Sequence, residues 1–143
     1  MKIRVLTATP KGKLKSIAEV LATLAANDIY KADIIPPAYS CDNERLIIIL
    51  ITPGSIPKKP DFERFIEGMN RQRTRNVAFI VDGTAEQMQS IFDKVKENNV
   101  NIVDNILYMV GGLPSFLSMF SKLTAEEKAT ATEWFNDVLT KLA

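Results

Sequence analysis

The feature that most constrains the fold of this chain is an uninterrupted apolar run, Leu46 to Thr52, which reads LIIILIT. Its side chains do not alternate between apolar and polar, as they do in a strand with one face in water. A strand without alternation has to be covered on both faces. We therefore expect Leu46 to Thr52 to be a central strand of a parallel sheet with helices packed on either side.

Other strand patterns recur along the chain, and helical patterns separate them. Further strands are predicted at Ile3–Ala8, Ala32–Ile35, Val77–Val81 and Ile106–Val110. Apolar residues at helical spacing predict four helices, around residues 14–25, 62–69, 88–95 and 124–142. A chain in which strands and helices alternate is expected to form an α/β domain, in which right-handed crossovers join five mostly parallel strands.

The connection between the second and third predicted strands is unusually short. Only Pro36 to Arg45 separate them, whereas a parallel crossover with a full helix needs about a dozen residues or more. We expect a short turn or a single helical turn there. An antiparallel second strand is the alternative.

Length and composition favour one domain that spans residues 1–143. The net charge is +1, so no bulk field draws the protein to nucleic acid or to an anionic membrane. The dense basic runs, Lys58–Lys59 and Arg71 to Arg75, are expected to be solvated surface. No apolar stretch reaches the roughly 18 residues that span a bilayer.

Cysteine and histidine usage narrows the chemistry. A single cysteine, Cys41, cannot form an internal disulfide, and no signal-peptide pattern precedes the first strand, so we expect a cytoplasmic protein. The chain has no histidine, which excludes histidine triads and imidazole-ligated zinc. Neither a catalytic residue nor a metal site is predicted.

The predicted topology locates a ligand site. Open α/β sheets bind ligands beyond the carboxyl ends of their strands, where the winding direction switches. With the strand order 2-1-3-4-5, this point lies between the first and third strands. The loops that meet there are Thr7 to Leu14, Thr52 to Pro60 and Asp82 to Thr84.

The first of these loops leads directly into a helix, whose free N–H groups and dipole favour an anion. Thr9 supplies a hydroxyl, Lys11 and Lys13 supply positive charge, and Gly12 allows close approach to the backbone. The residues therefore predict a phosphate site. A plain strand-to-helix turn with solvated lysines is the alternative.

The layout and this loop resemble the flavodoxin family, whose phosphate loop typically reads Ser/Thr-x-Thr-Gly-Asn-Thr. Thr9 matches the first hydroxyl position and Gly12 matches the glycine. Lys11 stands where threonine is usual, Lys13 where asparagine is usual, and Leu14 replaces the final threonine. The region near the last helix resembles the flavodoxin-like, menaquinone-linked protoporphyrinogen oxidases.

The resemblance implies a flavodoxin-like three-layer sandwich that binds FMN. Its cofactor-binding residues would come from the three loops: Thr9, Pro10, Lys11, Gly12, Lys13, Leu14, Thr52, Pro53, Gly54, Ser55, Asp82 and Gly83. The second and third loops lack the aromatic residues that commonly stack on the flavin ring in this family.

One further segment attracts attention, Gly111 to Leu123, which reads GGLPSFLSMFSKL. Its apolar residues 113–120 predict a hydrophobic contact with a quinone, a membrane surface or a partner, or else a short helix that covers the end of the sheet.

Three functions remain open. The first is FMN-dependent electron transfer to a redox protein partner, and the second is a flavodoxin-fold binding or interaction module that has lost flavin. The third is a quinone-linked flavin oxidoreductase that uses residues 111–123 as its acceptor surface. If the chain is an enzyme, we expect an FMN-dependent oxidoreductase.

Overall fold

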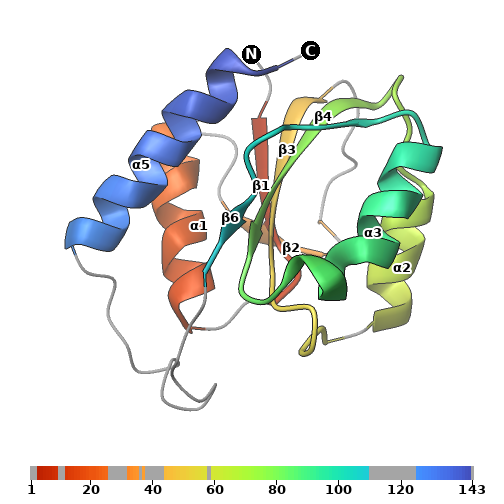
Figure 1. Cartoon of the computed structure of the whole chain (residues 1–143), viewed down its shortest axis with the longest axis horizontal. Helices are drawn as coiled ribbons and strands as arrows, with labels where there is room; N and C mark the ends of the chain where they lie inside the picture. The colour runs from red at the N-terminus through yellow and green to blue at the C-terminus, as the bar shows by residue number, and fades with distance from the viewer. Residues whose placement is uncertain are drawn as a thin grey trace.

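A computed structural model describes residues 3–9, 12–25, 32–35, 37, 44–57, 59–109 and 125–142. A central sheet carries helices on both faces (Figure 1). One face is covered by α1 (Gly12–Leu24) and α5 (Ala125–Thr140). The other is covered by α2 (Lys59–Glu67) and α3 (Ala85–Glu97).

The described strands confirm the predicted α/β class and strand order. They are β1 (Ile3–Thr7), β2 (Asp33–Ile34), β3 (Glu44–Ile51), β4 (Thr74–Val81), β5 (Asn101–Ile102) and β6 (Leu107–Tyr108). Their order is β2-β1-β3-β4-β5, with β6 also paired to β4. All of these pairs are parallel.

The apolar run is the centre of the sheet, as predicted. β3 lies between β1 and β4, and residues 46–51 are fully buried. Ile47, Ile49 and Ile51 join the core on the α2–α3 side, while Leu46, Ile48 and Leu50 join the core on the α1–α5 side. Burial on both faces explains why the sequence does not alternate.

The short connection between β2 and β3 joins two strands that run in the same direction. β2 is parallel to β1, with Leu6 paired to Asp33 and Thr7 to Ile34, and β1 is parallel to β3. The antiparallel alternative is therefore wrong. The connection itself, apart from Pro37, lies outside the described residues.

A buried arginine ties these strands together near their amino ends. The guanidinium of Arg4 on β1 lies 3.7 Å from Asp33 of β2 and 3.8 Å from Glu44 of β3. Arg4 is 4% exposed. A charge buried this deeply is tolerated because opposite charges flank it.

The strand predicted over Ile106–Val110 is present as β6, which pairs with the end of β4. The sequence does not predict β5, which pairs with β4 nearer its beginning. Between β5 and β6, the carbonyl of Asn105 accepts a hydrogen bond from the indole N–H of Trp134 (2.8 Å), and the side-chain NH₂ group of Asn105 donates to Asp137 (2.6 Å). These contacts attach the segment between the two strands to α5. Val110 lies outside the described residues.

Polar side chains stabilise the starts of two helices. Thr84 accepts a hydrogen bond from the main-chain amide of Gln87 (3.3 Å), and the Gln87 side chain accepts one from the main-chain amide of Thr84 (2.9 Å); this reciprocal pair is a capping box at the start of α3. Asp61 lies in the first turn of α2, where a carboxylate interacts favourably with the helix dipole. None of the described helices is long and apolar enough to span a bilayer.

Candidate functional site

The carboxyl ends of β1, β3 and β4 meet at one edge of the sheet, at the lower end of Figure 1. The loops that leave these strands carry all the predicted site residues. Of those residues, Pro10 and Lys11 lie outside the described part of the chain. The other predicted residues all belong to the described part of the chain.

Thr9 links the first loop to the second. Its hydroxyl accepts a hydrogen bond from the Thr52 amide (3.0 Å) and donates one to the Ser55 carbonyl (2.9 Å). The residue is 5% exposed. A hydroxyl has a single hydrogen to donate, so in this arrangement Thr9 has none left for a phosphate oxygen.

Thr52 extends this connection to the third loop. Its hydroxyl donates a hydrogen bond to the Asp82 carboxylate at 3.3 Å, and the Asp82 amide donates to the carbonyl of Ile51 at 2.8 Å. Side-chain hydrogen bonds thus run from Thr9 through Thr52 to Asp82. They hold the three strand ends in one fixed relation.

The second and third loops also contact each other directly. A Cβ atom at Gly83 would lie 3.1 Å from the Pro53 ring and 2.6 Å from the Gln87 side-chain oxygen, so a side chain there would displace Gln87 and press on Pro53. Gly54, by contrast, has open space around it. The Ser55 amide closes the turn by donating to the Thr52 carbonyl at 2.9 Å.

The remaining predicted residues begin α1. Gly12 has a φ of 60°, a left-handed conformation that glycine adopts without steric cost. The Lys13 ammonium forms an ion pair with Glu127 of α5, at 3.0 Å. Leu14 is buried in the core and can offer a ligand only its main chain.

At this site an anion would meet main-chain N–H donors rather than side-chain donors. The first amides of a helix have no partner within the helix and carry the positive end of its dipole. Gly12, Lys13 and Leu14 supply those amides here. Among the described residues, no cluster of three potential metal-ligating side chains occurs.

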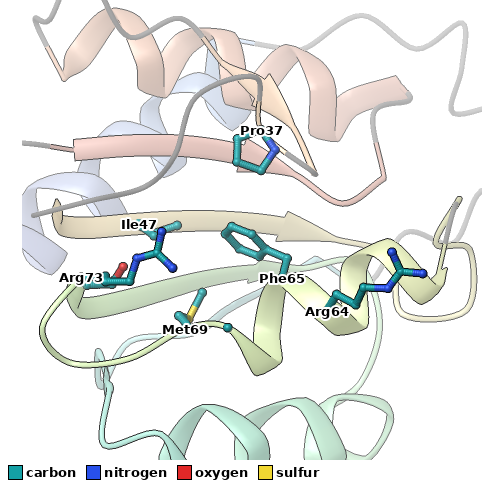
Figure 2. A pocket seen from close by; sticks show the side chains of 8 residues that line it. Pro37, Ile47, Arg64, Phe65, Met69 and Arg73 are labelled. Atoms are coloured by element: carbon teal, nitrogen blue, oxygen red, sulfur yellow. The ribbon is translucent and has the colours of Figure 1, made fainter.

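Sequence reasoning missed a small cavity on the α2 side of β3, shown in Figure 2. It has a volume of about 190 Å³, below the roughly 300 Å³ at which ligand pockets usually begin. Figure 2 shows Phe65 and Ile47 at its centre, Arg73 beside them and Arg64 pointing away. Phe65 belongs to the apolar stripe of α2, which gave the only sequence signal for this cavity.

A larger groove of about 330 Å³ lies between α2 and α3. Phe62, Ile66 and Ile91 contribute apolar surface to it, and charged side chains such as Glu63 and Lys94 also line it. It borders the second loop through Pro53. None of the described residues that line this groove belongs to the first loop.

Comparison with known proteins finds no family model and no curated protein that match this chain. The solved structures that are similar in fold include the following two. A flavodoxin-like domain from Synechococcus sp. matches with a TM-score of 0.58 and 7% identity, covering 96% of this chain and 95% of its own. A diflavin flavoprotein from Nostoc sp. matches with a TM-score of 0.51 and 11% identity, covering 97% and 96%. At these identities the likeness concerns the fold alone.

Proposed function

We propose that this chain, which has the flavodoxin-like fold predicted from its sequence, binds FMN at the loop after β1 and transfers electrons to a redox protein partner. The observation that carries the proposal is the left-handed backbone conformation of Gly12. This residue begins α1 just after β1, at the switch point of the sheet. The similarity to a diflavin flavoprotein supports it.

The phosphate end of FMN fits this loop. The main-chain amides of Gly12, Lys13 and Leu14 would hold the phosphate. Thr9 would not contact the phosphate itself; it would position the loop, since its hydroxyl is hydrogen-bonded to Thr52 and Ser55. Lys13 would add a weaker field, because Glu127 neutralises its charge.

The flavin ring of FMN would find fewer contacts than the phosphate. The described residues of the second and third loops, 52–57 and 82–84, include no aromatic side chain. Pro53 also lies against Gly83, so the ring would rest on the outer surface of these loops. With little apolar burial, affinity for FMN should be low. When bound, FMN would supply the redox chemistry, and the chain its binding and orientation.

A cytoplasmic location belongs to the same proposal. It is supported by the single cysteine, which suits a reducing compartment.

A flavin-free binding or interaction module is the second candidate. It is favoured because the Thr9 hydroxyl and the Lys13 ammonium are both engaged within the protein. The quinone-linked alternative depends on residues 111–123, which lie outside the described part of the chain, so it stays a prediction.

Titration of FMN with the purified protein, followed by flavin fluorescence, separates the two candidates. We expect FMN to bind and riboflavin, which lacks the phosphate, to bind at least about tenfold more weakly because the charge-assisted contacts are lost. Gly12→Ala should weaken FMN binding, since alanine disfavours the left-handed backbone.

Lys128→Gln, an exposed change on α5, is the matched control and should leave FMN binding unchanged. The unfolding transition of each variant establishes that it is folded. FMN fluorescence that does not respond to the protein would rule out the flavin proposal and leave the binding module.

A further inference from the structure

The edge of the sheet opposite the FMN loop holds a third concavity. The α2–β4 and α3–β5 connections form it, at the amino ends of β4 and β5, in the upper right of Figure 1. Its volume is about 750 Å³. The described residues that line it are Asn70, Arg71, Gln72, Arg75, Asn98 and Asn99.

The charge of this concavity is not balanced. Arg71 and Arg75 are both exposed, and the guanidinium group of neither forms a hydrogen bond or ion pair with the described chain. All the other described lining residues are carboxamides, so none carries a negative charge. Two like charges that share one depression repel each other unless an anion lies between them.

Some exposed cations of the described chain have partners: the closest nitrogen–oxygen distances are 3.6 Å for Arg64 and Asp61, 3.9 Å for Lys94 and Glu97, and 3.1 Å for Lys141 and Asp137. Other cationic side chains do not, and these are Lys15, Arg45, Lys59, Lys96 and Lys128. What distinguishes the concavity is that two unpaired guanidinium groups line the same depression.

Hydrogen bonds fix the walls of the concavity. The Asn98 amide group donates to the Ile66 carbonyl at 3.0 Å and thereby joins the ends of α2 and α3. The Asn70 side-chain oxygen accepts from the Arg73 amide at 3.1 Å, which leaves its NH₂ group as a donor. Asn99 has a φ of 61°, a conformation that asparagine tolerates better than most residues.

We propose that this concavity binds the phosphate groups of a small, multiply charged organic phosphate. Guanidinium groups match phosphate oxygens in a planar, two-pronged geometry. Asn70, Gln72 and Asn99 supply neutral donors for the remaining oxygens.

A small ligand suits the site better than nucleic acid. Nucleic-acid sites carry basic stripes that follow a backbone, whereas here two arginines line one depression of a chain with a net charge of +1. The site lies at the edge of the sheet opposite Gly12, so it is independent of the FMN proposal.

The test is a calorimetric titration of the full chain with inorganic pyrophosphate at constant ionic strength. We expect saturable binding that Arg71→Gln and Arg75→Gln each weaken about tenfold, because each removes a charge-assisted contact. Arg64→Gln is the matched control, since Arg64 is an exposed arginine outside the concavity, and it should bind pyrophosphate as the unchanged protein does.

Three outcomes would overturn the proposal: no binding of pyrophosphate, an equal loss in the Arg64→Gln control, or tighter binding of a single-stranded RNA oligonucleotide than of pyrophosphate. A parallel FMN titration keeps the two proposals apart. The arginine variants should bind FMN normally, whereas Gly12→Ala should leave pyrophosphate binding intact.

Discussion

Thr9 is the residue on which the geometry of the candidate site depends most. It is buried, and its hydroxyl is shared between two main-chain groups of the second loop. The motif resemblance marks Thr9 as a phosphate ligand. In the structure its hydroxyl cross-links two loops, so the residue shapes the site whether or not a ligand is present.

Replacement of Thr9 by valine should therefore destabilise the protein. Valine has nearly the same shape but no hydroxyl, so the Thr52 amide and the Ser55 carbonyl would lose their partner. We expect the free energy of unfolding, measured with urea, to fall by about 2 kcal/mol. Thr9→Ser keeps the hydroxyl and should lose distinctly less. Equal losses in the two variants would show that the hydroxyl contributes little.

The sequence predicts where the candidate site lies, but not the side-chain contacts within it. A strand followed by a glycine and a helix places the loop at the switch point. The two partners of Thr9 lie 43 and 46 positions away, and that of Lys13 lies 114 positions away, and no local pattern encodes pairs that distant. Whether these residues hold a cofactor stays a prediction.

At the scale of elements, α5 does more than cover one face of the sheet. Near its end, Asp137 accepts hydrogen bonds from Asn105 (2.6 Å) and pairs with Lys141 (3.1 Å), which in turn donates to the Asp104 carbonyl (3.2 Å). These contacts attach the helix to the interruption between β5 and β6. They form a small polar cluster at the surface.

This cluster predicts a pH dependence. The hydrogen bond from Lys141, and then that from Asn105, lower the pKa of Asp137 below its ordinary value of 3.8. A pKa lowered by folding means that the stabilisation is complete above about pH 4 and is lost as the pH falls through the folded value. Asp137→Asn should therefore show a smaller loss of stability on acidification.

Urea unfolding at a series of pH values from about 6 to 3 measures this difference. Glu133→Gln, an exposed change on the same helix, should keep the pH dependence of the unchanged protein. Parallel curves for Asp137→Asn and the unchanged protein would show that the cluster does not stabilise the fold.

The elements also differ in how well the sequence predicts them. β3 and β4 are eight residues each and almost fully buried, so composition identifies the apolar part of each. The polar start of β4, residues 74–76, is not predicted from the sequence. β5 has two residues, Asn101 and Ile102, too few for any pattern, and only its pairing with β4 in the tertiary structure defines it.

At the scale of the whole molecule, the two cores share one sheet. Side chains from both faces of β3 and β4 enter them, so neither core can form without these strands. That residues 1–143 form one domain stays a prediction.

The single tryptophan makes this prediction testable. Trp134 is 4% exposed and packs in the α1–α5 core, so its fluorescence reports on that side of the sheet. Circular dichroism reports on all the helices. If the chain is one cooperative unit, urea transitions followed by the two signals should coincide. Separate midpoints would show that the two sides of the sheet unfold independently.

The shortness of the outer strands has a consequence for crowded solutions. β2 on one side, and β5 and β6 on the other, have two residues each. Exposed sheet edges can recruit strands from other chains, which is a common origin of aggregation, and very short edge strands are one of the ways in which proteins prevent it. The long, apolar β3 and β4, which would be hazardous at an edge, lie in the interior of the sheet. Self-association of the folded protein should therefore use side-chain surfaces rather than extension of the sheet.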